Sequence, residues 1–256
     1  MVHRDREIHR TGAEPSDGEV QYAGESFWAI PGPVRPVLTF RDVETTAYCP
    51  RKQYYRDRDA DPDGEVPGRV RERAALAFRY RDLLAADDGT LAAAPIAVAP
   101  TTFRSRLGAA RARLDAWPHL VDPAGRNVLL CGKDARGVAD KVLGTAPPAP
   151  SIVFAGDPPD RGVWHPQRVR VVAAAMALAW ERETRVERGF AEYPAHGVVR
   201  EVPLDPRRRD EYRTALRAAA RIDDPPPRLS NREKCAACEY RTDCGVRTRS
   251  LRSLLG

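Results

Sequence analysis

Three cysteines lie within ten residues near the carboxyl end of this 256-residue chain, in the pattern C-x2-C-x5-C formed by Cys235, Cys238 and Cys244. Two thiolates three residues apart can bind one metal from a single turn, and the third can close on the same face. Three cysteines leave a tetrahedral site one ligand short. Cys49, which stands just before a helix-breaking proline much earlier in the chain, is the natural candidate for the fourth ligand.

This four-cysteine set suits more than one kind of centre. Four thiolates bind an iron–sulfur cluster and zinc alike, so the spacing does not choose between them, and ordinary buried thiols are the remaining alternative. Five cysteines without a secretory signal argue against a disulfide framework. The fifth cysteine, Cys131, falls in an apolar strand-like segment, and we interpret it as a small core residue.

The basic residues of the chain are nearly all arginines. Only four of the 42 basic residues are lysines, and the net charge is +6. Arginine suits bidentate recognition of phosphate, although a GC-rich genome would produce the same bias. The candidate nucleic-acid contacts lie in a basic–aromatic stretch and in two basic helices: Arg51, Lys52, Tyr54, Tyr55, Arg104, Arg111 and Arg208.

The composition is that of a globular protein. Hydrophobic residues make up 42% and charged residues 30% of the chain. No apolar run approaches the roughly 20 residues that a bilayer span needs. Met1–Arg10 alternates charges and lacks the apolar core of a signal peptide. We therefore expect a soluble cytoplasmic protein without membrane contact.

The elements that must position the cysteines alternate between helices and strands. A helix capped by Thr39, with Asp42 completing a capping box, is expected from about Phe40 to Cys49. Further helices are expected at 68–86, 103–117, 166–183 and 205–220, and strands at 127–132, 136–143, 151–154, 189–193 and 198–204. This order predicts an α/β fold with a central mixed sheet.

The chain is predicted to divide into three parts. Residues 1–36, with scattered charges and several prolines, indicate a weakly structured amino-terminal arm. Residues 37–245 form the folded domain, in which a proline-rich linker at 224–227 leads into the cysteine segment. Residues 246–256 form a basic tail with leucines at helical spacing, which is a candidate docking segment for a protein partner.

The two cysteine motifs together resemble a known family. The segment Cys49-Pro50-Arg51-Lys52-Gln53-Tyr54-Tyr55 and the C-x2-C-x5-C tail resemble the CRISPR-associated RecB-like exonucleases, from about Thr39 to Cys244. The resemblance implies a PD-(D/E)xK, restriction-endonuclease-like fold, in which a mixed sheet is flanked by helices. It further implies that the four cysteines hold a 4Fe–4S cluster that staples the amino-terminal helices to the carboxyl-terminal tail. The implied partner is DNA, single-stranded or at ends.

The hydrolytic motifs of that family are mostly missing here. Its G-x-x-D element falls on Gly137-Val138-Ala139-Asp140, so Asp140 is the candidate metal carboxylate, with a strand-end surface aspartate as the alternative. Its E-x-K element falls on Phe154 and Gly156, and its Q-x-x-x-Y element on Val172 and Met176. Losing a metal-binding carboxylate and the lysine removes most of the catalysis, because both stabilise charge where it develops.

These patterns predict a degenerate RecB-like nuclease that binds DNA through basic surfaces and has lost its hydrolytic site. One alternative is an active exonuclease that holds Mn²⁺ or Mg²⁺ with Asp140 and a substitute carboxylate such as Asp157. Another alternative is a structural or partner-binding protein with a zinc staple.

Overall fold

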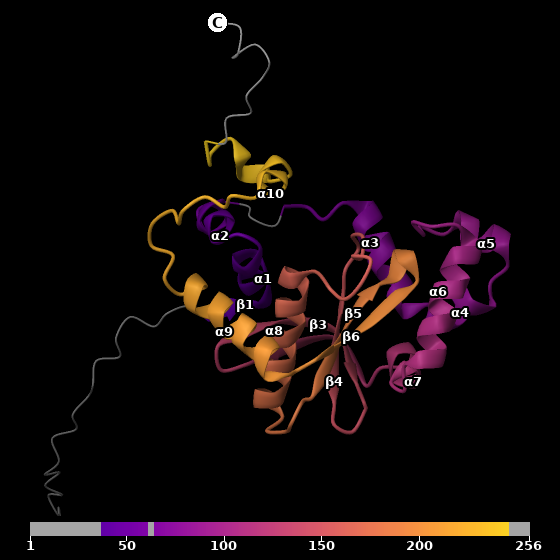
Figure 1. Ribbon diagram of the computed structural model, residues 1–256. Helices are drawn as coiled ribbons and strands as arrows, with labels where there is room; N and C mark the ends of the chain where they lie inside the picture. Colours follow the sequence, from indigo (N-terminus) through magenta and orange to yellow (C-terminus); the bar gives the residue numbers. More distant parts are fainter. Residues whose placement is uncertain (1–36, 61–63, 246–256) are drawn as a thin grey trace, which may run out of the picture. The chain divides into compact units, whose positions relative to one another are not determined.

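The computed structural model describes residues 37–60 and 64–245. The arm expected at 1–36 and the docking segment expected at 246–256 lie outside the described residues. Within the described residues the chain forms a six-stranded mixed sheet flanked by helices (Figure 1), so the expectation of an α/β fold with a mixed sheet is confirmed.

The sheet is built around its third strand. Its strands are β1 (Leu38–Thr39), β2 (Gly125–Cys131), β3 (Ala135–Leu143), β4 (Ala149–Val153), β5 (Arg188–Tyr193) and β6 (Val198–Pro203). Strands β2, β3 and β4 form an antiparallel meander, and the short β1 pairs parallel to β3. Strand β5 pairs parallel to β4, and β6 returns antiparallel to β5. The parallel β4–β5 pair requires a crossover, which α8 (His165–Glu181) supplies.

Helices cover both faces of this sheet. The others are α1 (Phe40–Tyr48), α2 (Pro50–Arg56), α3 (Gly68–Ala75), α4 (Tyr80–Ala85), α5 (Asp88–Ala93), α6 (Pro100–Arg113), α7 (Trp117–Val121), α9 (Pro206–Ala219) and α10 (Arg232–Ala236), with short 3-10 turns η1 (Leu76–Phe78), η2 (Pro194–His196) and η3 (Glu239–Arg241). Figure 1 shows α8 and α9 on one side of the sheet and α4, α6 and α7 on the other. The buried side chains accordingly form two clusters, one on each side.

The long helix α8 is the centre of the first cluster. Most of its run from Val169 to Leu178 is buried, and each fully buried valine or leucine contributes roughly 1.5–3 kcal/mol. Pro166 stands in the first turn, where its missing N–H leaves no helical bond unmade. Neither α8, with 17 residues, nor any other helix in the described residues is long and apolar enough to cross a membrane.

Helix α1 begins and ends where the sequence predicts. The Asp42 N–H donates to Thr39 Oγ1 at 3.0 Å, and the Thr39 N–H donates to Asp42 Oδ2 at 2.7 Å, which completes the capping box. Losing such a cap typically costs about 1 kcal/mol. The helix stops at Cys49, whose φ of −163° and ψ of 113° are extended, and Pro50 then opens α2. Cys49 is therefore held at a fixed corner between two helices.

The helix expected at 68–86 is broken in the structure. Helix α3 buries none of its side chains, whereas Leu76, Ala77 and Tyr80 just after it are buried. The chain must change direction to bury them, and a 3-10 turn makes that change. The turn lets the carbonyl of Ala77 accept a hydrogen bond from Lys141 Nζ at 2.7 Å, so the break serves a contact across the core.

The helix expected at 103–117 is shifted towards the amino terminus. It starts at Pro100, which occupies the first helical position, and it ends at Arg113. Leu114 leaves the helix with a φ of −92° and a ψ of 115°, and its side chain is buried together with Trp117. Burial of these two side chains therefore ends α6 and starts α7.

The interpretation of Cys131 as a core residue is wrong, because its side chain is exposed. Cys131 is the last residue of β2, which pairs only with β3 among the described strands. The preceding residue, Leu130, is fully buried. Side chains alternate along a strand, so the residue after Leu130 faces outward. Apolar neighbours in the sequence did not reveal which face of the strand Cys131 occupies.

Candidate metal centre

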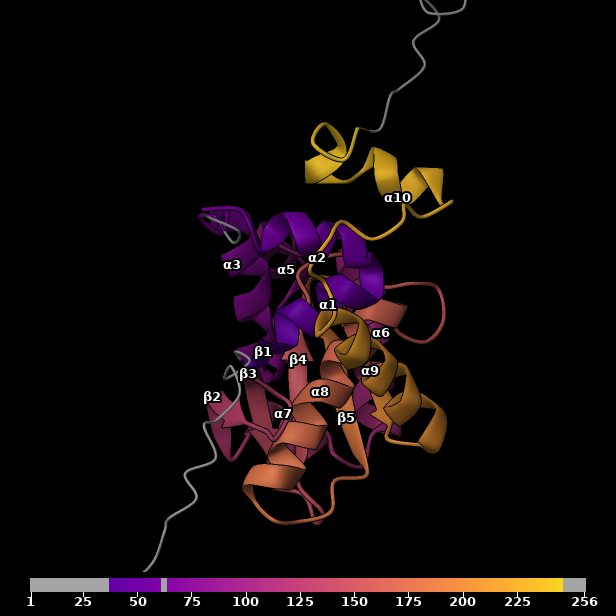
Figure 2. The ribbon, with the colours of Figure 1, turned by 90° about the vertical axis from the view of Figure 1, so that its left-hand side faces the viewer.

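The two cysteine motifs meet in space. Cys49 lies at the corner between α1 and α2, and the other three cysteines lie in the tail segment around α10 and η3. All four line one cavity, and all four are free thiols. Both ribbon views show α10 beside the α1–α2 end of the domain (Figures 1 and 2). The tail therefore folds back over the amino-terminal helices.

Local hydrogen bonds shape the tail segment. The Asn231 side chain accepts from the Lys234 N–H at 3.1 Å and caps α10. The Cys238 N–H donates to the Cys235 carbonyl at 3.3 Å, and the Cys244 N–H donates to the Tyr240 carbonyl at 2.8 Å. Neither α10 nor η3 has a buried side chain. This segment is held by polar contacts rather than by an apolar core of its own.

Tyr48 and Lys234 connect the end of α1 to the tail. The Tyr48 hydroxyl donates to the Lys234 carbonyl at 3.3 Å, and Lys234 Nζ donates to the Tyr48 carbonyl at 3.4 Å. The same ammonium lies 4.8 Å from the centre of the Tyr48 ring. Burial, and then the nearby thiols of Cys238 and Cys49, raise the pKa of Tyr48. The phenol therefore stays a hydrogen-bond donor.

Arg51 of α2 contacts both the tail segment and the linker that precedes it. Its Nε donates to Cys244 Sγ at 3.2 Å, and its Nη1 donates to the Pro226 carbonyl at 2.8 Å. Its Nη2 donates to the Tyr55 hydroxyl at 3.3 Å. One guanidinium thus ties α2 to a cavity cysteine and to the linker that precedes the tail.

The basic–aromatic stretch expected to contact nucleic acid is engaged with the tail. Lys52 forms an ion pair with Glu239 at 2.9 Å. The Tyr55 hydroxyl donates to the Asp243 carbonyl at 3.1 Å, and the Tyr55 ring stacks on Tyr240 with centroids 6.1 Å apart. Tyr54 lies under a guanidinium, that of Arg58, at 3.6 Å. Contact of these residues with bases stays a prediction, but their contacts give them a role in holding the tail.

The donor set of the cavity fits a thiolate-bound centre. Thiolates are the ligands of iron–sulfur clusters and of many structural zinc sites. Basic side chains line the same cavity and can offset the negative charge of thiolates: Arg51, Lys52, Arg228, Lys234 and Arg241. In the described residues, no three His, Cys, Asp or Glu side chains already form a group that could hold an ion. The structure contains a shared cavity for the thiols rather than a closed ligand cage.

Asp140, the candidate catalytic carboxylate, is bound inside the sheet. Its Oδ2 accepts from the Val153 N–H at 2.8 Å, just beyond the last β3–β4 bridge. Burial raises the pKa of Asp140, while the bond from Val153 and the charge of Arg170 lower it in part. Packing explains the glycine at position 137 of the same motif, because a Cβ on Gly137 would lie 2.5 Å from Phe40 Cδ2.

Lys141, the residue after Asp140, belongs to a buried network that sequence reasoning missed. Its Nζ donates to Glu192 Oε2 at 2.8 Å and to the Leu120 carbonyl at 2.9 Å, in addition to the Ala77 carbonyl. Glu192 Oε1 accepts from the Ser151 hydroxyl at 2.6 Å. Lys141, Ser151 and Glu192 are all 0% exposed. A phosphate therefore cannot reach Lys141 or Glu192.

The signal for this network was the alternation of β3. Lys141 lies between Asp140 and Val142 on the strand, so its side chain points to the face opposite theirs. That face is covered by α6 and α7, and it carries the second buried cluster. A lysine at such a position requires a buried anion. Glu192, on another strand of the same sheet, could have been recognised as that anion.

Asp157, the possible substitute carboxylate, is exposed in the loop after β4. Its Oδ1 lies 2.9 Å from His196 Nε2. It lines a cavity between that loop, α6 and β6, rather than the hollow beside Phe154 and Gly156. Asp157 therefore lines a different hollow from Phe154 and Gly156. The structure does not bring Asp140 and Asp157 together around one ion site.

Two of the arginines expected to follow a phosphate backbone hold helices in place. Arg104 pairs with Asp88 at 2.7 Å and donates to the Ala86 carbonyl at 2.9 Å, which joins α6 to α5. Arg208 binds Asp205, the residue that caps α9. Arg111 is exposed and forms no ion pair with a described residue.

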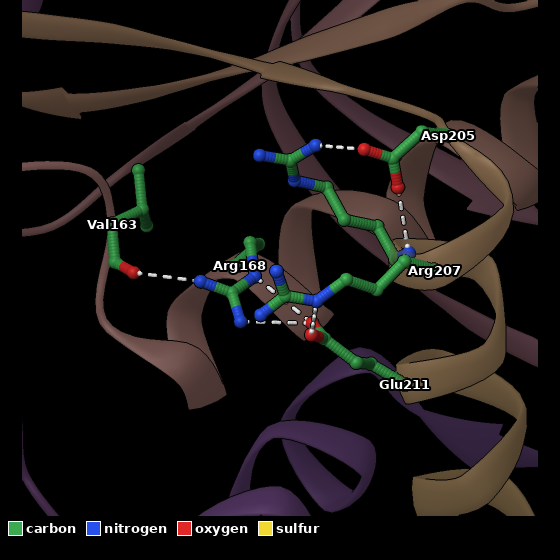
Figure 3. Close-up of polar contacts among 6 residues, drawn as sticks. Val163, Arg168, Asp205, Arg207 and Glu211 are labelled. Atoms are coloured by element: carbon green, nitrogen blue, oxygen red, sulfur yellow. Dashed lines mark hydrogen bonds and ion pairs between the residues drawn. The ribbon is translucent and has the colours of Figure 1, made fainter.

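Figure 3 shows the contacts at the start of α9. Arg168 of α8 donates to the Val163 carbonyl and, through Nε and Nη2, to Glu211 at 3.0 and 2.9 Å. Arg207 donates to the same carboxylate at 3.2 Å. The Arg168 guanidinium joins α8 to α9, whereas Arg207 pairs within α9, so a run of arginines in the sequence does not by itself mark a free basic face.

A basic groove lies next to the cysteine cavity. It extends from Val153–Gly156 at the end of β4 to Lys234 in the tail. Its basic lining residues are Arg41, Lys52, His165, Arg170 and Lys234, and its acidic ones are Glu44 and Glu233. Glu44 is paired with Arg170 at 3.1 Å. Trp164 stands at the groove with 51% of its surface exposed.

The cavity and the groove together form one region, at the end of the domain where the tail meets α1, α2 and β4. Its thiols come from both ends of the described chain, and its charge is mainly positive. The sequence of this protein matches no protein-family model and no curated protein.

Proposed function

We propose that this protein is a RecB-like member of the PD-(D/E)xK fold that carries a 4Fe–4S cluster and binds DNA without hydrolysing it. Cys49, Cys235, Cys238 and Cys244 would hold the cluster, and the groove beside them would hold a DNA strand. The observation that carries the proposal is the single cavity lined by these four cysteines, which lie at opposite ends of the described chain. Free thiols throughout the described chain suit the reducing cytoplasm, where we place the protein.

The tail segment has no buried side chain of its own, and this supports a bound centre. Neither α10 nor η3 buries a side chain, and so short a segment cannot hold its position by apolar burial. Polar contacts on a protein surface contribute little each. A centre bound by Cys49 and the three tail cysteines would add the missing stabilisation, because metal binding to folded ligands is itself folding free energy.

The groove supports DNA binding without hydrolysis. Basic side chains outnumber the carboxylates in its lining, and an exposed tryptophan at its side offers a stacking surface for a base. A hard cation needs several oxygen ligands beside the phosphate. Glu44 is already paired with Arg170, Asp140 is bound to the Val153 N–H, and Phe154 and Gly156 offer no ligand. The order β2–β3–β4, crossover α8 and parallel β5 is compatible with the proposed fold.

Metal analysis of anaerobically purified protein tests the cluster. We expect a brown protein with about four iron and four sulfide per chain, as a four-cysteine cubane site requires. Cys238→Ser should lose the colour and release the tail, which limited proteolysis at the 224–227 linker would detect. Cys131→Ser is the matched control, because it removes an exposed thiol outside the cavity. A finding of stoichiometric zinc without sulfide would show that the cysteines hold a zinc ion and not an iron–sulfur cluster.

A nuclease and binding assay tests the second half of the proposal. We expect single-stranded DNA to bind at low salt, with an affinity that falls steeply as salt rises because phosphate contacts release counterions. We expect no cleavage with Mg²⁺ or Mn²⁺. Cleavage by the wild type that Asp140→Ala abolishes would establish the alternative, an active exonuclease. Absence of binding at low salt would favour a structural or partner-binding protein.

A further inference from the structure

A second cavity, on the α6 side of the sheet, gathers three arginines that the proposed function does not use. Arg106 and Arg113 reach it from α6, and Arg200 reaches it from β6. The loop from Asp157 to Asp160 forms the opposite wall. We call this cavity the arginine pocket. None of its lining residues lines the cysteine cavity or the basic groove.

Two of the three guanidiniums are held by backbone carbonyls, and none of the three forms an ion pair with a carboxylate of the described residues. Arg113 Nη2 donates to the Val199 carbonyl at 3.0 Å, and Arg200 donates to the carbonyls of Asp160, at 3.0 Å, and Gly162. Within the described residues, neither Arg106 nor Arg113 forms an ion pair. Burial, and then the charges of Arg113 and Arg106, lower the pKa of Arg200, while Tyr193 and Asp160 raise it in part. Like charges are thus gathered around one cavity, and a bound anion would reduce their mutual repulsion.

The pocket also contains two carboxylates, Asp157 and Asp160, which offset part of the charge of its three arginines. The Asp157 carboxylate is engaged by His196 Nε2 at 2.9 Å. Asp160 is exposed, and its backbone carbonyl rather than its carboxylate accepts the bond from Arg200. The carbonyl bonds hold the guanidinium planes of Arg113 and Arg200 without cancelling their charge, so the three arginines of the pocket still outnumber its two carboxylates.

We propose that the arginine pocket binds a phosphate group, either of a free nucleotide or of a nucleic-acid strand. The guanidinium fork matches phosphate oxygens in a bidentate way, and three forks around one cavity can take a doubly charged phosphate. This site stands apart from the proposed function, because it needs neither the cysteines nor the basic groove.

Calorimetric titration of the full chain at low salt tests the site. The probes are deoxyadenosine 5′-monophosphate and deoxyadenosine, which lacks the phosphate. We expect the monophosphate to bind and the nucleoside not to bind. Arg106→Gln should weaken binding about tenfold, the usual loss for one charge-assisted hydrogen bond. Arg106 makes no hydrogen bond or ion pair with a described residue, so this variant should melt like the wild type.

Arg81→Gln is the matched control, because it removes one exposed arginine of the neighbouring helix α4 and should leave binding unchanged. Oligonucleotides with a 5′-phosphate or a 5′-hydroxyl identify the source of the phosphate. A tenfold loss in Arg106→Gln for both oligonucleotides, without binding of the monophosphate, assigns the site to the strand backbone. If Arg106→Gln binds every probe as the wild type does, or if no probe binds at low salt, the proposal is wrong. Cysteine variants that lose iron should bind the monophosphate normally, so the two proposals fail separately.

Discussion

The cysteine cavity and the Lys141–Glu192 pair both join distant parts of the chain, but they do so in opposite ways. Lys141 and Glu192 are fully buried, and each charged group has its partners inside the core. The cysteine cavity is open, and its thiols are half-buried and free. Buried charges that are fully satisfied stabilise one arrangement, whereas accessible thiols with basic neighbours are available to a ligand. The cysteine cavity, unlike the buried pair, therefore leaves its side chains accessible to a ligand.

The largest effect should come from breaking the buried pair. Lys141→Met leaves the Glu192 carboxylate without its cation in the core, and loss of one partner of a buried pair typically costs about 3–5 kcal/mol. Chemical denaturation should show that loss in the free energy of unfolding. The double variant Lys141→Met, Glu192→Leu should recover a large part of it, because no uncompensated charge remains. A single variant as stable as the wild type would show that the pair is not what holds this core.

A smaller effect is expected at the tail from Arg51→Gln. This change removes the hydrogen bonds to Cys244 and Pro226, each worth about 1 kcal/mol. Because the tail has no buried side chain, local release should exceed global destabilisation. Hydrogen exchange should therefore rise at 235–245 while the sheet amides stay protected. Arg81→Gln serves as the control, and equal exchange in both variants would remove Arg51 from the junction.

The ion pair of Lys52 and Glu239 should contribute less still. It is partly exposed, and such pairs are worth about 0.2–1 kcal/mol. Lys52→Glu should loosen the tail modestly, and the exchanged pair Lys52→Glu, Glu239→Lys should restore it. The measurement is the rate of proteolysis at the linker, and it should respond to salt. A rate that stays raised in the exchanged pair would mean that Lys52 acts through another contact.

The smallest effect concerns the pH dependence of Asp140. Burial raises the pKa of its carboxyl above the ordinary value of 3.8, so the native chain holds this proton more tightly than the unfolded chain does. Stability from this group is therefore present at low pH and is lost as the pH rises from 3.8 through the raised pKa. Asp140→Asn keeps an acceptor for the Val153 N–H without titrating. Its Tm relative to wild type should rise between pH 3.5 and pH 7, and a parallel pair of Tm curves would contradict this.

The sequence predicted the order of the elements and the alternation of helices and strands, because local periodicity determines both. The capping box of Thr39 and Asp42 was visible for the same reason. The break before Tyr80 and the outward face of Cys131 were not visible, since each depends on which side of an element meets the core. The PD-(D/E)xK assignment and the cluster stay predictions.

The sequence determined which residue types the candidate site contains, and the tertiary structure determined which of them lie next to one another. Spacing alone could bring Cys235, Cys238 and Cys244 together, because they share one short segment. Only the folding back of the tail onto α1 and α2 adds Cys49 to their cavity, through contacts such as that of Arg51 with Cys244. Likewise, Asp140 and Lys141 are neighbours in the chain but lie on opposite faces of β3, where one binds a backbone N–H and the other a buried glutamate. The physical reason is that a strand turns adjacent side chains to opposite faces, and what covers each face is set by parts of the chain far away.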